Sequence, residues 1–306
     1  MVSGVRWYKG NLHTHTLKSD GDASPEKVAR WYGRHGYDFL TLSDHDRLTL
    51  LGHLHGKSGS TIPLMIPGEE VVIRPSVEDT EVHINAIGIA RQVEPIAAKE
   101  LFPAIQANID AVLAAGGIVS INHPNFSWAL DHDIISRVTG ASLLEVFNGE
   151  PSVNMYGAPG RPSFEQIWDG VLSAGKLIFG VATDDSHNYL DFSPGLSNPG
   201  RGWVMVRTAE LTEESIIEAL ASGSFYASTG VALPQLEVSQ EGINLGIEQD
   251  WDYVYTTTFT GRGGVTLAEN VGLEARYRVR GDEGYVRATV RSSYGTKAWT
   301  QPVWLK

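Results

Sequence analysis

The order of strand-like and helix-like segments is the feature that most restricts how this chain can fold. Up to about residue 207, short runs of β-branched and aromatic residues alternate with longer segments of helical pattern. The predicted strands are 38–42, 117–121, 143–147, 177–181 and 203–206. This alternation favours a parallel sheet with right-handed crossover connections, either open or closed into a barrel.

The predicted helices between these strands carry recognisable start and stop signals. Ser24 is a candidate N-cap, Pro25 follows at the first helical position, and Gly36 is a candidate C-terminal glycine. Further helices are expected at about 94–115, at about 161–175 and at 212–223, each ending at glycine. The Gly- and Pro-rich stretch 188–202 is predicted to be a long loop, either a lid or a plain surface excursion.

After about Gly230 the helical pattern gives way to alternating apolar and polar residues. The segments 235–239, 253–259, 275–279, 285–290 and 302–305 are predicted to be strands of a small antiparallel module. We therefore expect two domains. A barrel-forming domain would span 1–228, and a β-sandwich-like module would span 229–306.

Composition excludes several classes of protein. The 306 residues are 42% hydrophobic, which is enough to form a core, and the net charge of −12 gives no general attraction to nucleic acid or anionic membranes. The sequence has no apolar stretch of transmembrane length and no signal-peptide pattern, so we expect a cytoplasmic protein. With no cysteine, any metal ion must be bound by histidine and carboxylate.

Six of the ten histidines lie in polar clusters, most of which directly follow apolar runs. Because the carboxyl ends of parallel barrel strands share one face, these clusters can meet in space. Imidazole with carboxylate is a ligand set for Zn²⁺, Mn²⁺ or Fe²⁺. The clusters are His13-Thr14-His15, Asp44-His45-Asp46, His83, Asn122-His123-Pro124 and Asp184-Asp185-Ser186-His187, with Ser19-Asp20-Gly21 and Gly68-Glu69-Glu70 as additional carboxylate clusters.

Each cluster taken singly also has an ordinary explanation. His83 alone fits a hydrogen-bonded core histidine, and Gly68-Glu69-Glu70 alone fits the start of a surface strand. The combination of clusters is what favours a metal site. No role is assigned to the four remaining histidines, which are His35, His53, His55 and His132.

In this order the clusters resemble those of PHP (polymerase and histidinol phosphatase) domains, over residues 10 to about 225. The resemblance implies a distorted (β/α)7 TIM-like barrel that binds two or three divalent ions of zinc, manganese or iron. By motif position, His13, His15, Glu70 and Asp185 would bind the first ion, and Glu70 would bridge to a second ion bound by His83 and His123. Asp20, His45 and His187 would bind a third, and a two-ion version of the site is the alternative.

A weaker likeness concerns the C-terminal part. The segments 223–230, 285–290 and 297–302 resemble the end of carbaryl-hydrolase-like metallohydrolases. This likeness implies a β module that supports the barrel and binds no ligand of its own.

The resemblance implies a metal-dependent hydrolase, foremost a phosphoesterase that cleaves a small phosphorylated or nucleotide-type substrate with a metal-bridged hydroxide. Glu70 and Asp185 would belong to the catalytic set, and His187 or Asp44 would protonate the leaving oxygen. Carbamate, amide or ester hydrolysis at the same centre and a non-catalytic scaffold are the alternatives. The expected partner is a small anionic molecule, with no nucleic acid or membrane, and candidate phosphate-binding residues are Arg74, Arg161 and Arg201.

Overall fold

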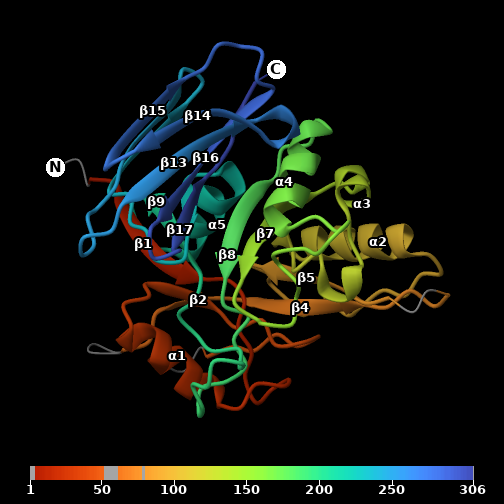
Figure 1. Cartoon of the computed structure of the whole chain (residues 1–306). Helices are drawn as coiled ribbons and strands as arrows, with labels where there is room; N and C mark the ends of the chain where they lie inside the picture. The colour runs from red at the N-terminus through yellow and green to blue at the C-terminus, as the bar shows by residue number, and fades with distance from the viewer. Residues whose placement is uncertain (1–3, 52–60, 78–79, 306) are drawn as a thin grey trace.

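The computed structural model describes residues 4–51, 61–77 and 80–305, and these residues form a mixed α/β structure (Figure 1). His53 and His55 lie outside the described residues. One sheet of the N-terminal part contains β4 (Gly68–Ile73), β5 (Val82–Ile87), β6 (Ile118–Ile121), β7 (Ala141–Asn148) and β8 (Phe179–Thr183). Beside it run β1 (Arg6–Asn11), β2 (Phe39–Thr41), β3 (Leu64–Ile66) and β9 (Trp203–Thr208), which belong to a larger sheet.

The two sheets do not close into the expected TIM-like (β/α)7 barrel. Only one residue separates β3 from β4, and β4 pairs antiparallel with β5, so no crossover helix lies in this part of the chain. β5 and β6 are also antiparallel, whereas β6, β7 and β8 are parallel as expected. Between the sheets, isolated bridges join Thr14 to Ser186 and His45 to Glu70.

The helices begin and end largely where the cap residues predict. In α1 (Pro25–Arg34), Ser24 accepts from the backbone N–H of Lys27, and Gly36 follows the helix with a φ of +76°. Thr212 caps α5 (Glu213–Ser222), which ends at the left-handed Gly223. A capping box precedes α4 (Phe164–Ser173), and a short helix that was not expected, α3 (His132–Arg137), lies before it.

The helix expected at 94–115 is shorter than predicted and forms α2 (Leu101–Ala114). The side chain of Asn108 donates to the carbonyl of Ile96 and accepts from its N–H, both at 2.8 Å. These two bonds hold the chain before α2 in a non-helical conformation. Helices α2 and α4 pack against the five-stranded sheet, around buried Ile109 and Trp168 (Figure 1).

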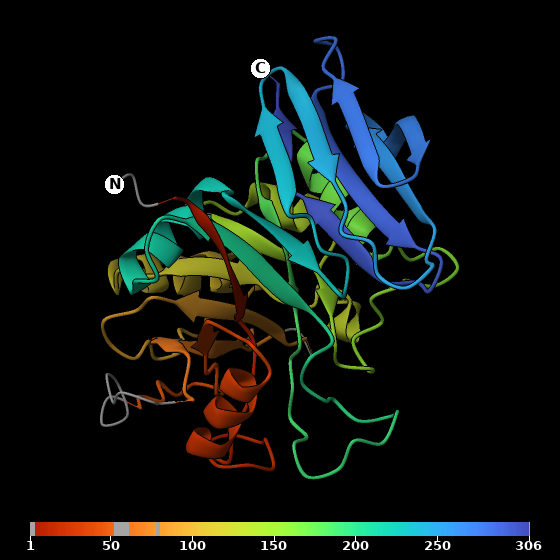
Figure 2. The same ribbon diagram turned by 90° about the vertical axis from the view of Figure 1, so that its left-hand side faces the viewer.

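The C-terminal strands extend the larger sheet beyond the N-terminal part, and the hydrogen-bonded order crosses the 228/229 boundary through β10 and β17. Figure 2 shows these strands at the opposite end of the molecule from α1. The strands that extend the sheet are β10 (Phe225–Ser228), β13 (Tyr255–Gly261), β14 (Val265–Val271), β16 (Tyr285–Ser292) and β17 (Lys297–Thr300), with β18 (Val303–Trp304) on β16. A second layer consists of β11 (Gln235–Ser239), β12 (Gly242–Gly246) and β15 (Glu274–Arg278).

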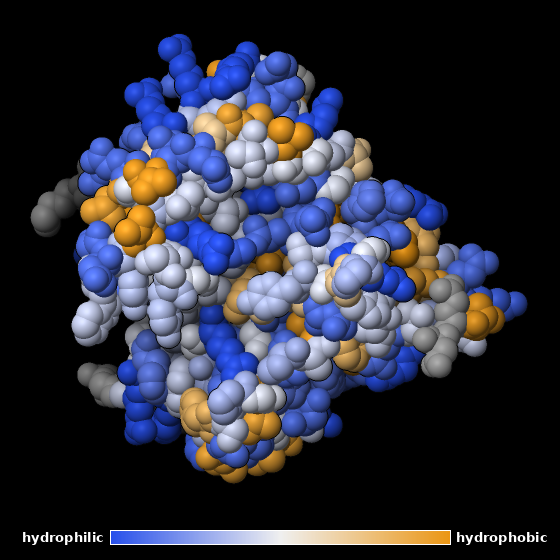
Figure 3. All heavy atoms as spheres, viewed as in Figure 1, coloured by the Kyte–Doolittle hydropathy of each residue, from blue (hydrophilic) through white to orange (hydrophobic). Residues whose placement is uncertain are grey.

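Hydrophobic residues on the face drawn in Figure 3 lie in small separate groups. One group is at the lower edge, in the area of α1 and the 188–202 loop, where Leu190 and Phe192 are exposed. Among the described residues, no helix is both long enough and apolar enough to cross a bilayer.

Candidate metal centre

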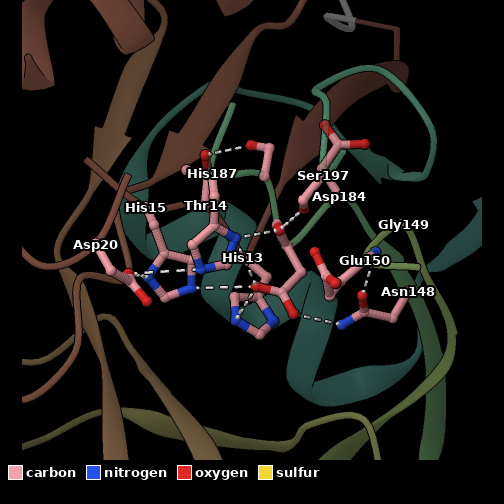
Figure 4. A network of polar contacts seen from close by, with 12 residues as sticks. His13, Thr14, His15, Asp20, Asn148, Gly149, Glu150, Asp184, His187 and Ser197 are labelled. Atoms are coloured by element: carbon pink, nitrogen blue, oxygen red, sulfur yellow. Dashed lines mark hydrogen bonds and ion pairs between the residues drawn. The ribbon is translucent and has the colours of Figure 1, made fainter. Parts of the chain in front are cut away.

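The structure brings the polar clusters together where the two sheets meet. His13 and His15 follow β1, His45 follows β2, His123 follows β6, and Asp185 and His187 follow β8. Glu70 projects from β4 and His83 from β5. Figure 4 shows His13, His15, Asp20 and His187 pointing towards one another from different segments. Six histidines and three carboxylates that lie far apart in the sequence therefore form one cluster.

Glu70 is the centre of this cluster. Its Oε2 lies 3.2 Å from ring nitrogens of His13, His15 and His45. Its Oε1 lies 3.1 Å from Nδ1 of His83 and 3.2 Å from Nε2 of His123. A carboxylate that faces five imidazole rings is placed to bridge more than one cation.

Glu69 precedes Glu70 on β4 and faces away from the cluster. Its Oε1 accepts from the N–H of Val93 at 2.5 Å. Successive side chains of a strand point to opposite faces, so only one of the two glutamates can lie in the cluster.

Asp185 adds a second buried carboxylate to this group. Its Oδ1 lies 3.1 Å from Nε2 of both His13 and His15. The residue has a φ of +49°, in the left-handed region that aspartate tolerates better than most residues. With Asp185 in this conformation, the side chains of both Asp185 and His187, which follow β8, lie in the cluster.

Asp20 forms the outer group, and its side chain is 53% exposed. Its carboxylate oxygens lie 3.5 Å from Nδ1 of His15, 3.4 Å from Nε2 of His45 and 3.4 Å from Nε2 of His187. His15 and His45 thus turn one nitrogen towards Glu70 and the other towards Asp20.

Three sets of ligand-type atoms each lie within 4.8 Å of one another. They are His13, His15, Glu70 and Asp185; His15, Asp20, His45 and His187; and His45, Glu70 and His83. The first set is the one that the sequence resemblance implies for the first ion. In the third set His45 occupies the place expected for His123, whose Nε2 nevertheless lies 3.2 Å from Glu70.

Several buried atoms at the centre have no hydrogen-bond partner within the described part of the chain. They are Nε2 of His13, Nε2 of His15, Nδ1 of His45 and Oε2 of Glu70. Each of the three nitrogens lies 3.2 Å from Oε2 of Glu70, but none of these contacts has the geometry of a hydrogen bond. Buried polar atoms normally have hydrogen-bond partners. Three imidazole nitrogens and a carboxylate oxygen that lack them and lie together are the kinds of atom that bind a metal ion.

The charges of the cluster stabilise one another. Burial by itself raises the pKa of Glu70, but the neighbouring His13 and His83 hold it well below its usual range. Burial lowers the pKa of His83, and Glu70 and Glu81 outweigh this effect and raise the pKa to about 10. The pKa of His187 is likewise raised to about 9, by Asp20 and Asp185 against burial. Without cations, His83 and His187 are therefore protonated near neutral pH, and their charge balances that of the neighbouring carboxylates.

Residues to which the sequence analysis assigned no role of their own position the ligands. Glu145, fully buried in β7, accepts from Nδ1 of His13 at 2.7 Å and from the N–H of His123 at 2.6 Å. Asn122 donates to Glu70 at 2.8 Å, and Asn148 donates to Asp185 at 3.1 Å. The signal that could have revealed Glu145 is a charged residue within the apolar strand 143–147.

The 188–202 loop is held in place and braces the ligands from β8. Asp184 accepts from the N–H groups of Gly200, Arg201 and Gly202 at 2.6–2.9 Å and from the hydroxyl of Tyr32. The N–H of His187 donates to the carbonyl of Ser197 at 3.0 Å. These bonds attach the loop to the segment that carries Asp185 and His187.

Asp44 was a candidate proton donor, but the structure places it outside the cluster. Its buried carboxylate accepts from the hydroxyls of Thr16, Ser19 and Thr49 and from the N–H of Thr16. With these bonds Asp44 shapes the loop that carries Asp20, because Thr16 and Ser19 belong to that loop.

The three arginines expected to bind phosphate also lie outside the pocket. Arg74 pairs with Glu81 at 2.5 Å, and Arg161 lies over the ring of Trp128 at 5.4 Å. Arg201 donates to the carbonyl of Gly149 at 2.7 Å and to Asn198 at 3.1 Å, where it joins two loops.

The cluster opens into a pocket of about 360 Å³. Among the described residues, no lysine, no arginine and no part of the C-terminal module lines it. Besides seven of the nine residues of the cluster, the lining consists of Glu81, Phe126, Glu150, Ser152 and Val153. The positive charge available to an anionic substrate here is therefore that of bound cations or of protonated histidines such as His83 and His187.

Comparison with known proteins identifies a fold. No family model matches the sequence, and no curated protein matches it. A two-domain protein from Bacteroides vulgatus that contains a predicted PHP-like metal-dependent phosphoesterase superposes with a TM-score of 0.53, at 17% identity, over 94% of this chain and 91% of that one. At this identity the likeness shows a shared fold.

Two further solved structures are similar over a smaller part of the chain. One is assigned as a metal-dependent phosphoesterase from Bifidobacterium adolescentis, with a TM-score of 0.43 and 17% identity over 62% of this chain and 89% of that one. The other is an amidohydrolase from Chromobacterium violaceum, with a TM-score of 0.42 and 16% identity over 62% and 93% of the two chains.

Proposed function

We propose that this chain is a metal-dependent phosphoesterase that cleaves a small phosphorylated substrate. The observation that carries the proposal is that three unpartnered buried nitrogens, of His13, His15 and His45, each lie 3.2 Å from the unpartnered Oε2 of Glu70. The shared fold with the Bacteroides vulgatus protein supports it, since that protein contains a predicted PHP-like metal-dependent phosphoesterase.

The residues that would hold the ions follow from the three sets. His13, His15, Glu70 and Asp185 would bind the first ion, and Glu70 with His83 and His123 or His45 would bind the second. The outer set around Asp20 would bind a third. Divalent zinc, manganese or iron ions in such a site supply a hydroxide near neutral pH and positive charge for the phosphoryl oxygens.

The protein's own groups have separate tasks in this proposal. Glu145 retains the proton on Nδ1 of His13, so that Nε2 faces the site with its lone pair. His187 lines the pocket and, if the outer set binds no ion, is the candidate donor of a proton to the leaving oxygen. Asn122 and Asn148 orient Glu70 and Asp185.

Hydrolysis of a carbamate, amide or ester is the second candidate. The observation that favours it is the absence of lysine and arginine among the described residues that line the pocket, because a neutral carbonyl substrate needs no cationic side chain. A bridging hydroxide attacks carbon as well as phosphorus. The resemblance of the C-terminal segments to carbaryl-hydrolase-like proteins points the same way. A non-catalytic scaffold is less favoured, since every expected ligand position is filled.

The test is His13→Ala beside the matched control His35→Ala, which removes an exposed imidazole stacked on Trp31. Bound metal is measured first, and turnover is then measured with nitrophenyl phosphate, bis-nitrophenyl phosphate and a nitrophenyl carbamate. We expect metal and phosphoesterase activity in the control and loss of both in His13→Ala. Unchanged metal content and turnover in His13→Ala would exclude the assignment. Turnover of the carbamate alone would favour the second candidate.

A further inference from the structure

Two of the segments that carry the ligand-type residues lie side by side. The segment 13–15 follows β1, and the segment 185–187 follows β8. An isolated parallel bridge joins their central residues, Thr14 and Ser186, and two backbone hydrogen bonds of 2.9 and 3.0 Å connect the segments. The outer residues of each segment belong to the cluster, whereas the hydroxyls of Thr14 and Ser186 lie 2.7 Å from each other.

Two tyrosines and an aspartate extend this contact between hydroxyls. The hydroxyl of Tyr189 lies 2.5 Å from those of both Thr14 and Ser186. The hydroxyl of Tyr32 lies 2.9 Å from that of Ser186 and donates to Oδ2 of Asp184 at 2.7 Å. We call these five side chains the hydroxyl network. All of them are buried, so each group depends on the others for its hydrogen bonds.

The carboxylate of Asp184 determines where the protons of the hydroxyl network lie. Both of its oxygens also accept from backbone N–H groups, so Tyr32 must donate to it. Tyr32 then has no proton left for Ser186, and Ser186 donates to Tyr32. Thr14 and Tyr189 supply the protons for the remaining contacts. Because every proton is in use, removal of one hydroxyl deprives a neighbour of its partner.

Through Thr14 the network also reaches the segment that carries His45. The hydroxyl of Ser43 accepts from the N–H of Thr14, and the N–H of Ser43 donates to the carbonyl of Thr14, both at 2.9 Å. Thr14 is therefore bonded to the segments that follow β2 and β8, while it belongs itself to the segment that follows β1. A displacement of Thr14 would move ligand-type residues of three segments.

We propose that the side chains of the hydroxyl network are positioning residues of the metal centre, which set the spacing between the segments 13–15 and 185–187. None of them lines the pocket, so they act through the ligands next to them. Oδ1 of Asp185 lies 3.1 Å from Nε2 of both His13 and His15, and a shift of one segment against the other would change both distances. This inference rests on the proposed function, because it concerns the metal centre which that function requires.

The test uses variants that remove single hydroxyls, with matched controls. Tyr32→Phe and Thr14→Val each remove one hydroxyl of the network, and Thr14→Ser retains it. The control Tyr37→Phe removes a buried hydroxyl that has no hydrogen-bond partner within the described part of the chain. Its ring lies 4.7 Å from that of Tyr32, so the control samples the same surroundings.

Co²⁺ is the probe, because its visible absorption spectrum reports the arrangement of its ligands. The dissociation constant is measured by competition with a chelator, and urea denaturation of the metal-free proteins measures stability separately. We expect Tyr32→Phe and Thr14→Val to bind Co²⁺ about tenfold more weakly, with altered spectra, as for other groups that orient metal ligands. Thr14→Ser and Tyr37→Phe should keep the wild-type affinity and spectrum.

Wild-type affinity and spectrum in Tyr32→Phe and Thr14→Val would overturn the inference, even if both variants were less stable than wild type. An equal loss of affinity in Tyr37→Phe would overturn it as well, since packing alone would then explain the effect. In both cases the wild-type protein still binds Co²⁺, and the proposed function stands. If wild type binds no Co²⁺, Zn²⁺ or Mn²⁺, both proposals fail.

Discussion

Nδ1 of His13 lies 2.7 Å from Oε1 of Glu145, and both side chains are completely buried. A carboxylate can only accept at this position, so the contact assigns the proton to Nδ1 and leaves Nε2 free to bind a metal ion. The same carboxylate accepts from the N–H of His123, and it therefore positions two of the histidines of the cluster.

Glu145→Gln should weaken metal binding. In wild type one oxygen of Glu145 accepts from His13 and the other from His123. The amide of glutamine can accept only at its single oxygen, so one of these two bonds is lost. We expect the metal affinity to fall about 10- to 100-fold, as for other groups that orient metal ligands. Competition with a chelator measures it, and circular dichroism verifies that the variant is folded. A folded variant with wild-type affinity would show that Glu145 does not orient His13.

Metal binding should release protons. In the metal-free protein the pKa of His83 is raised to about 10 and that of His187 to about 9, so both rings are protonated near neutral pH. Metal ions bind only the neutral ring, and apparent affinity should therefore rise with pH. Calorimetric titration in two buffers with different ionisation enthalpies counts the protons, and equal apparent enthalpies in the two buffers would contradict this prediction.

The metal-free protein should lose stability at alkaline pH. A histidine pKa that folding raises stabilises the folded state fully below the unfolded value of about 6.5. For His83 this contribution declines as the pH rises and is gone above its folded pKa of about 10. Thermal unfolding across this range should show a falling midpoint without metal and a flatter profile with metal. An unfolding temperature of the metal-free protein that rises with pH would contradict this prediction.

The contact between the C-terminal strands and α4 depends on a buried ion pair. Arg287 on β16 donates to both oxygens of Asp169 at 2.8 and 2.7 Å, and Tyr285 donates to the same carboxylate. Arg287→Met leaves that carboxylate without its cation, and we expect the free energy of unfolding to fall by about 3–5 kcal/mol.

Urea denaturation measures this loss, and the double variant Arg287→Met with Asp169→Leu serves as the comparison. Because it removes both charges, it should be more stable than Arg287→Met alone. Metal content should stay at the wild-type level in both variants, since neither residue lines the pocket. A double variant that is no more stable than the single one would argue against the buried charge as the cause.

Local sequence signals predicted much of the regular structure. The caps at Ser24 and Thr212 and the glycines after α1 and α5 are where the structure has them, because cap bonds join residues close in sequence. The predicted length of the helix at 94–115 was too great. The bonds between Asn108 and Ile96, which hold the segment before α2 out of the helix, cannot be predicted from a local sequence pattern. The prediction of a closed barrel was also wrong. The directions of β4 and β5 depend on the strands with which they pair, and a local sequence pattern does not specify these partners.

The sequence by itself determined the chemistry that this protein can offer: histidines and carboxylates, grouped at strand ends, with no thiol. Tertiary structure decided which of these groups converge. Glu70 and Asp185 face the cluster while Asp44 is bonded to neighbouring hydroxyls, and Glu145 supports His13 from a strand 132 positions away in the chain. The reason is physical: residue type fixes what an atom can bind, but the direction of a side chain follows from register, backbone dihedral angles and contacts between distant segments.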